Sequence, residues 1–276
     1  TITGTDANGC KNTSTVKVSV NAQPNVSAGS DVAICIGGNT SLQATGASSY
    51  TWTPATGLSC TNCANPVANP TTTTTYTVIG ANGSSCKDTA TVKVTVNSLP
   101  VVNAGTDQSL CMGTGVSLQA TGATSYTWTP ATDLSCSNCA SPTATPSATT
   151  TYTVTGTDAN GCKDTGVVKL TVNNLPVVSG GGDKDICPGD SVSLQGTGAA
   201  SYVWTPATGL SCTNCVSPKA SPATTTTYTV TGTDGNGCKN TSTVKVSVNA
   251  QPNVSAGSDV AICTGSNTSL QATGAS

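Results

Sequence analysis

The sequence predicts an all-β chain made of tandem antiparallel β-sandwich modules, and three observations support this fold class. Trp52, Trp128 and Trp204 are 76 residues apart, and the same period runs through all 276 residues without an insertion. Apolar and polar residues alternate with period two, as expected for half-buried strands. No segment carries the 3.6-residue apolar period of an amphipathic helix.

A longer repeat is superimposed on the 76-residue one. Residues 1–48 and 229–276 are identical at 44 of 48 positions, which indicates that a unit of three modules has been duplicated. Both termini fall inside a module, so we expect the sequence to belong to a longer chain. The predicted division is a C-terminal part of a module at 1–23, complete modules at 24–99, 100–175 and 176–251, and an N-terminal part at 252–276.

Each module contains seven segments with strand character. In the first complete module they are residues 25–28, 31–35, 40–45, 50–53, 65–68, 76–80 and 89–96. Gly37-Gly38, Asn82-Gly83 and the prolines at 54, 66 and 70 separate them, and these residue types suit turns and strand edges. Short strands at this spacing favour two packed antiparallel sheets.

The aromatic residues refine this prediction to an immunoglobulin-like topology. Trp52 lies in the third main strand, where such sandwiches bury one tryptophan, and Tyr76 opens the penultimate strand, where a tyrosine corner would lie. Leu42 and Val78 occupy the region of the inter-sheet cysteines of antibody domains. We therefore expect a buried role, with ligand stacking as the alternative, for Trp52, Trp128, Trp204, Tyr76, Tyr152 and Tyr228.

The composition argues against an enzyme and against several kinds of binding protein. His, Glu and Arg are absent, so a Ser-His-Asp triad, a Cys-His pair and a His-ligated zinc site are excluded, and paired glycosidase carboxylates are not expected. The net charge of −2 gives no electrostatic basis for binding nucleic acid. We predict no catalytic, cofactor-binding or metal-binding residue, and we identify no membrane-spanning segment in the sequence.

The fourteen cysteines recur as four per module: Cys35, Cys60, Cys63 and Cys86 in the first complete one. An even, periodic set in a chain rich in Thr and Ser favours disulfides in an oxidising, extracellular setting. A four-cysteine zinc site is the competing interpretation of the Cys-x-x-Cys pairs. A redox Cys-x-x-Cys is less favoured, because no βαβ pattern surrounds it.

We expect the close pairs to form local rings, namely Cys60–Cys63, Cys136–Cys139 and Cys212–Cys215. For the other cysteines two arrangements remain open. Pairing within a module would join Cys35 to Cys86, but in an immunoglobulin-like sandwich the first and last strands run parallel, which would separate the two by roughly 30 Å, beyond the reach of a disulfide. Pairing across the junctions would join Cys35 to Cys162 and Cys111 to Cys238. Cys187 belongs to the same set, and the partners of Cys10 and Cys263 would lie outside the sequence.

Three stretches of the second complete module resemble a known family: residues 126–135 (YTWTPATDLS), 151–162 (TYTVTGTDANGC) and 167–172 (VVKLTV). They are similar to the PKD-like and immunoglobulin-like repeats of large Bacteroidota cell-surface proteins, including SprB-type gliding adhesins. The resemblance implies export by the type IX secretion route and an extracellular or cell-surface location. It also implies O-glycosylation in Asp-(Ser/Thr)-aliphatic signals, at Thr89 and Ser191.

We expect a structural function: a rigid, disulfide-stapled repeat rod that forms the stalk or filament of a surface adhesin. The junctions are short and contain proline, which favours stiff end-to-end stacking. The expected partners are neighbouring modules of the same chain. Two alternatives stay open, a multivalent array that binds glycans or another surface, and a subunit that self-assembles with other copies into a filament.

Overall fold

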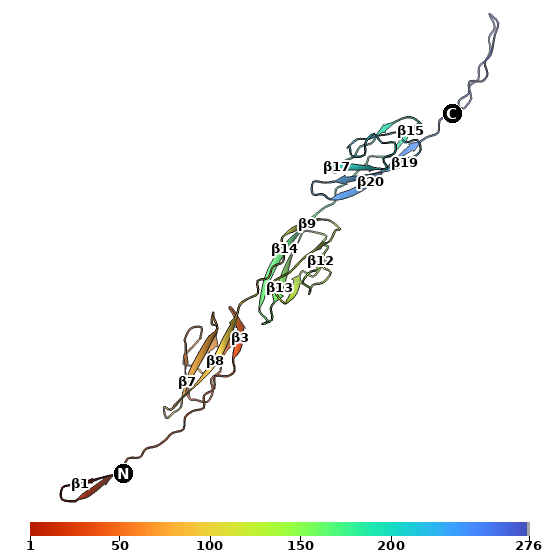
Figure 1. Ribbon diagram of the computed structural model, residues 1–276. Helices are drawn as coiled ribbons and strands as arrows, with labels where there is room; N and C mark the ends of the chain where they lie inside the picture. Colours follow the sequence, from red (N-terminus) through yellow and green to blue (C-terminus); the bar gives the residue numbers. More distant parts are fainter. Residues whose placement is uncertain (275–276) are drawn as a thin grey trace.

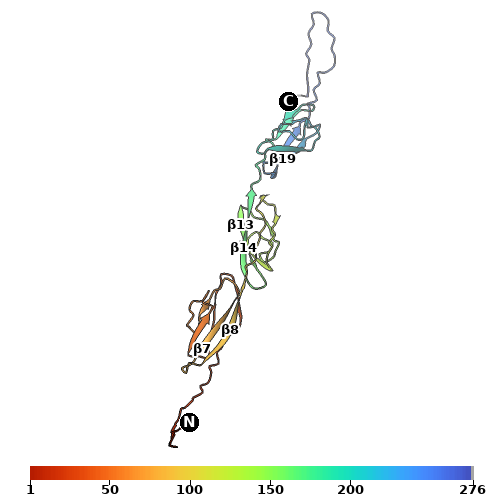
Figure 2. The same ribbon diagram turned by 60° about the vertical axis from the view of Figure 1, so that its left-hand side comes forward.

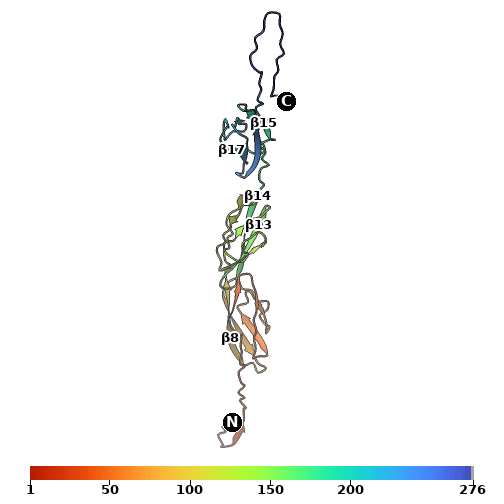
Figure 3. The ribbon, with the colours of Figure 1, turned by 90° about the vertical axis from the view of Figure 1, so that its right-hand side faces the viewer.

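The computed structural model describes residues 1–274 and has the predicted all-β fold, with no helix among these residues. Three β-sandwiches follow one another along an elongated array, and the three views agree on this shape (Figures 1, 2 and 3). A hairpin of β1 (Ile2–Thr5) and β2 (Lys11–Ser14) lies at the N-terminal end (Figure 1). The tandem immunoglobulin-like sandwich prediction is confirmed.

Each module has one four-stranded sheet and one minimal two-stranded sheet. In the first module, the order β3-β8-β7-β5 places β8 (Lys87–Asn97) between β3 (Val32–Cys35) and β7 (Thr74–Ala81), with β5 (Ser49–Thr53) at the edge. The second sheet pairs β4 (Thr40–Ser41) with β6 (Val67–Ala68).

The other two modules repeat this arrangement strand for strand. The second module contains β9 (Gln108–Cys111), β10 (Val116–Ser117), β11 (Ser125–Thr129), β12 (Thr143–Ala144), β13 (Thr150–Thr157) and β14 (Lys163–Asn173). The third contains β15 (Lys184–Ile186), β16 (Val192–Ser193), β17 (Ser201–Thr205), β18 (Lys219–Ala220), β19 (Thr226–Thr233) and β20 (Lys239–Val248).

The first and last strands of a module run parallel, as the immunoglobulin-like topology requires. In the first module β3 pairs with the end of β8, so that Val32 lies opposite Val94 and Cys35 opposite Asn97. The carboxylate of Asp31 accepts the N–H of Lys93 at 2.8 Å just before this pairing begins. The two strands therefore end together at the face of the module that meets the next one.

Several strands are shorter than predicted. The segment 25–28 forms only an isolated bridge from Ser27 to Thr45, and the segment 65–68 keeps two strand residues, Val67 and Ala68. Pro66 has no N–H to donate to a ladder, and its carbonyl instead accepts the N–H of Leu42 at 2.9 Å. Longer strands emerge where the alternation is strict, as in β8, which extends to Lys87 and Asn97.

The core of each module is one tryptophan, one tyrosine and a set of small aliphatic residues. Trp52, Trp128 and Trp204 are at most 1% exposed, and Tyr76, Tyr152 and Tyr228 are completely buried. The Tyr76 hydroxyl donates to the carbonyl of Thr56 at 2.8 Å, so it is satisfied although buried. Burial raises the pKa of this phenol above its ordinary value.

Candidate functional site

The most distinctive feature of the chain is a pair of disulfides that cross the module junctions. Cys35 of the first module is bonded to Cys162 of the second, and Cys111 of the second to Cys238 of the third. Both bonds span 127 residues of sequence, with Cα atoms 5.5 Å apart. Of the two arrangements that the sequence left open for these cysteines, the structure contains the pairing across the junctions.

A tight turn presents the second cysteine of each junction bond. The carboxylate of Asp158 accepts the N–H groups of Asn160 and Cys162, both at 2.8 Å, and its own N–H donates to the Cys162 carbonyl at 2.9 Å. Gly161 completes the turn at φ 80°. This Asx turn fixes Cys162 directly before β14, where it is bonded to the preceding module.

Strand direction explains why the in-module alternative does not form. Cys35 lies opposite Asn97, the last residue of β8, whereas Cys86 precedes Lys87, the first residue of that strand. An 11-residue strand separates the two cysteines, which is far beyond disulfide reach.

Four of the described cysteines are free: Cys10, Cys86, Cys187 and Cys263. Cys86 and Cys187 therefore do not share the bonds of their equivalents in the other modules. The sequence has no residue 127 positions before Cys86 or 127 positions after Cys187, which is the separation of the observed bonds. Cys187 instead lines an open surface depression of about 490 Å³, together with Ile186 and Asp190.

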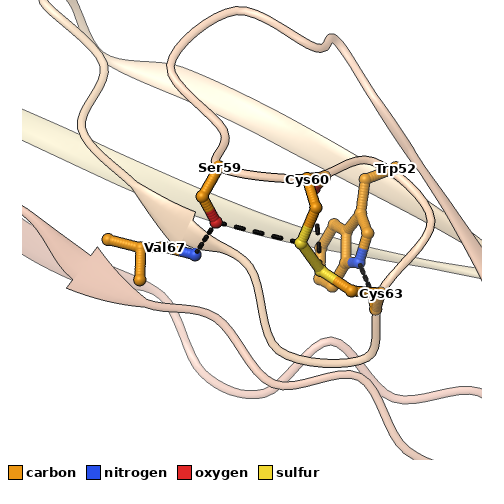
Figure 4. The surroundings of a disulfide bond; sticks show 5 residues. All are labelled: Trp52, Ser59, Cys60, Cys63 and Val67. Atoms are coloured by element: carbon orange, nitrogen blue, oxygen red, sulfur yellow. Dashed lines mark hydrogen bonds between the residues drawn. A yellow bond between two sulfur atoms is a disulfide. The ribbon is translucent and has the colours of Figure 1, made fainter.

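The close cysteine pairs form three local rings within the described residues: Cys60–Cys63, Cys136–Cys139 and Cys212–Cys215, each with Cα atoms 6.0 Å apart. The ring is tied to the core tryptophan, because the Trp52 indole N–H donates to the Cys63 carbonyl at 3.0 Å (Figure 4). The hydroxyl of Ser59 accepts the N–H of Val67 at 2.9 Å and so anchors the ring to the minimal sheet (Figure 4).

The link between ring and tryptophan is a feature that the sequence interpretation missed. It recurs in every described module, since Trp128 and Trp204 donate to Cys139 and Cys215, both at 3.0 Å. The available signal was the constant spacing of 11 residues between each tryptophan and the second cysteine of the ring. The ring therefore holds the largest core side chain in place.

The two predicted glycosylation residues, Thr89 and Ser191, are both exposed. Beside Thr89, the Asp88 carboxylate accepts the N–H of Val26 at 2.9 Å. The backbone N–H groups of Val26 and Thr89 lower the pKa of this carboxyl below its ordinary value. The hydroxyl of Thr89 is thus accessible, while the acidic residue of the signal is engaged in the fold.

The aromatic residues do not form an exposed platform. The tryptophans lie in the core. Tyr50 and Tyr126 are half-buried, and the hydroxyl of each donates to a nearby backbone carbonyl. The Tyr50 hydroxyl, for example, donates to the carbonyl of Ala47 at 2.9 Å. Among residues 1–274 there is no group of three or more metal-ligating side chains placed to hold an ion. No helix within the same residues is long and apolar enough to cross a bilayer.

Comparison with known proteins finds no family and only distant structural likeness. No protein-family model matches the sequence, and no curated protein matches it. Among solved structures, an I-band fragment of titin is 16% identical, with a TM-score of 0.45, over 84% of this chain and 100% of the fragment. The N-terminal eight immunoglobulin domains of Down syndrome cell adhesion molecule are 14% identical, with a TM-score of 0.44, over 83% of this chain and 37% of that one. Extracellular domains 3–5 of Drosophila OTK are 10% identical, with a TM-score of 0.34, over 83% and 98%.

Proposed function

We propose that this chain is a stiff extracellular spacer, the stalk of a bacterial surface adhesin. The observation that carries the proposal is the pair of disulfides that join each module to the next, Cys35–Cys162 and Cys111–Cys238. Stable disulfides persist in oxidising compartments, and tandem immunoglobulin-like modules with several of them are typical of extracellular structural or adhesive regions.

These two junction disulfides act as clamps: they restrict the movement of neighbouring modules relative to each other, which suits a spacer. Without them, neighbouring modules would be connected by a single chain crossing such as 97–102, which allows bending and twisting. A second covalent connection, from Cys35 to the turn that begins β14, fixes a second point of contact between the same two modules. Two connections restrain the angle between modules far more than one, so the array keeps its length.

The finer assignment, a Bacteroidota adhesin of the gliding type, rests on the resemblance of the repeat strings. The competing glycan-binding array is less well supported, because sugar-binding platforms commonly use exposed aromatic faces, and the tryptophans of this chain are buried. We therefore assign adhesion itself to other parts of such a protein and spacing to these modules.

Two measurements on the source cells test the proposal. Antibody against the repeat should label intact cells, and protease added outside should remove that label. Peptides that link Cys35 to Cys162 should be recovered from the cell-surface fraction after alkylation without reductant. Recovery of the chain from the cytoplasm, with these cysteines as free thiols, would contradict the proposal.

A further inference from the structure

We infer that the two junction disulfides form a covalent shortcut for tension, which shields the first and third modules and leaves the second as the one that lengthens under load. Its importance in the cell rests on the proposed function as a stalk, whereas the shortcut follows from connectivity alone. The inference uses the positions of the four bonded cysteines and the pairing of the strands that carry them.

The shortest covalent route through the three modules does not follow the backbone. From residue 24 the route runs about 11 residues to Cys35 and crosses to Cys162. From Cys162 it runs backwards about 51 residues to Cys111, crosses to Cys238, and runs about 13 residues to 251. This route has about 75 residues, against about 227 along the backbone, so the bonds reduce the maximal length roughly threefold.

Two long segments lie off this route, 36–110 and 163–237. Each belongs to a closed loop, and a closed loop carries no tension once the shorter route is taut. The first segment contains β5 and β7 with Trp52 and Tyr76, and the second contains β17 and β19 with Trp204 and Tyr228. The cores of the first and third modules are therefore outside the line of force.

While the second module is folded, residues 111–162 are not yet taut, so the load between Cys162 and Cys111 passes through the strands attached to these cysteines, β14 and β9. Tension enters at Cys162, which precedes β14, and leaves at Cys111, the last residue of β9. These strands are parallel neighbours, with Leu170 opposite Gln108 and Asn173 opposite Cys111. Pulling the start of β14 and the end of β9 apart slides one strand along the other. All of their hydrogen bonds are then loaded together, not broken one after another.

The bonds that create the shortcut are protected from solvent. Cys162 and Cys238 are completely buried, although their partners Cys35 and Cys111 are only partly so. Thiol exchange needs a thiolate to approach one of the two sulfur atoms. One of the two cysteines of each bond is therefore shielded from an attacking thiolate while the modules are folded.

Single-molecule force spectroscopy on the full chain, held at its termini, tests the inference. The second module should give one step of roughly 14 nm, since about 51 residues at about 3.4 Å each replace a folded span of about 36 Å. The first and third modules should give no resolvable step, because about 11 to 13 extended residues exceed the folded span of about 36 Å by about 1 nm at most. An unclamped module of about 74 residues would give roughly 22 nm.

Removing one clamp should move the long step to another module. Cys111→Ser with Cys238→Ser puts the whole third module on the route and shields the second, so a single step of roughly 22 nm replaces that of 14 nm. Removing all four junction cysteines should give three steps of roughly 22 nm. A matched control, Cys60→Ser with Cys63→Ser, opens a local ring and should leave the intact pattern unchanged.

The inference is overturned if protein whose junction bonds are verified by mass spectrometry gives three steps of roughly 22 nm, or ruptures without any step. It is also overturned if removing one clamp leaves the 14-nm step in place. Because the purified chain is measured, these outcomes are independent of where the protein lies on the cell. Failure to find the chain at the surface would refute the proposed stalk and leave the load route intact.

Discussion

Replacing Gly122 with alanine should selectively destabilise the second module. Gly122 has φ +93°, and a Cβ built on it would collide with the backbone carbonyl oxygen of Val101. The left-handed conformation costs an alanine about 1–2 kcal/mol, and displacing packed backbone costs about 1–3 kcal/mol. Alanine also lowers the conformational entropy of the unfolded chain, which offsets about 0.4–1 kcal/mol of this loss. The expected net loss is about 2–4 kcal/mol, from the roughly 4–11 kcal/mol that a module of this size has.

Gly113 offers a matched control, since it has φ +81° but no heavy atom within 4 Å of the added Cβ. Gly113→Ala should cost about 1 kcal/mol or less, because only the backbone term applies. Hydrogen exchange measured on the peptide that contains Trp128 reports the stability of the second module by itself. Gly122→Ala should reduce its protection by roughly 30- to 900-fold, and leave the peptide of Trp52 unchanged. Equal losses for the two glycine variants would refute the steric argument.

Three further predictions concern cysteines and titrating groups. Alkylation of the folded, unreduced chain should label Cys86 and Cys187, which are free, and spare Cys162; labelling of Cys162 without denaturant would contradict the junction bond. Burial, with a smaller contribution from the charge of nearby Asp133, raises the pKa of Tyr152 above its ordinary value. The neutral phenol therefore stabilises the second module below about pH 10, and this stabilisation is lost as the pH rises through the folded-state pKa. Absorbance titration should show that Tyr152 ionises above the ordinary range of tyrosine. The lowered pKa of Asp88 means that its hydrogen bonds stabilise the first module above the ordinary carboxyl pKa and are lost as pH falls through the folded value; Asp88→Asn should flatten this acid dependence in hydrogen exchange.

The fold was predictable from the sequence because its main sheet follows strict alternation. In β8, Val92 and Val94 point to the core and Lys93 to solvent, which is the pattern that period-two reasoning detects. The parallel pairing of β3 with β8 followed from the topology and led to the argument against a Cys35–Cys86 bond. Here local pattern and global arrangement agree.

The minimal sheet was predicted less well. Its strands are only two residues long, and their positions depend on contacts distant in sequence, such as the Leu42 N–H donating to the carbonyl of Pro66. A single sequence carries no periodic signal over two residues. The hydrogen bond from Trp52 to Cys63 was likewise unpredictable, because it requires the loop path that the disulfide ring itself imposes.

The distribution of disulfides matches the places where noncovalent structure is weakest. Within a module, the long strands β7 and β8 share eight paired positions, whereas β4 and β6 share two, and the Cys60–Cys63 ring is anchored beside this short pair. Between modules, the described strand ladders stop at residues such as Asn97, and there Cys35–Cys162 begins. A chain so poor in large apolar side chains cannot bury enough surface at these two places. The local rings thus complete the sandwich, and the junction bonds extend its cohesion from one module to the next.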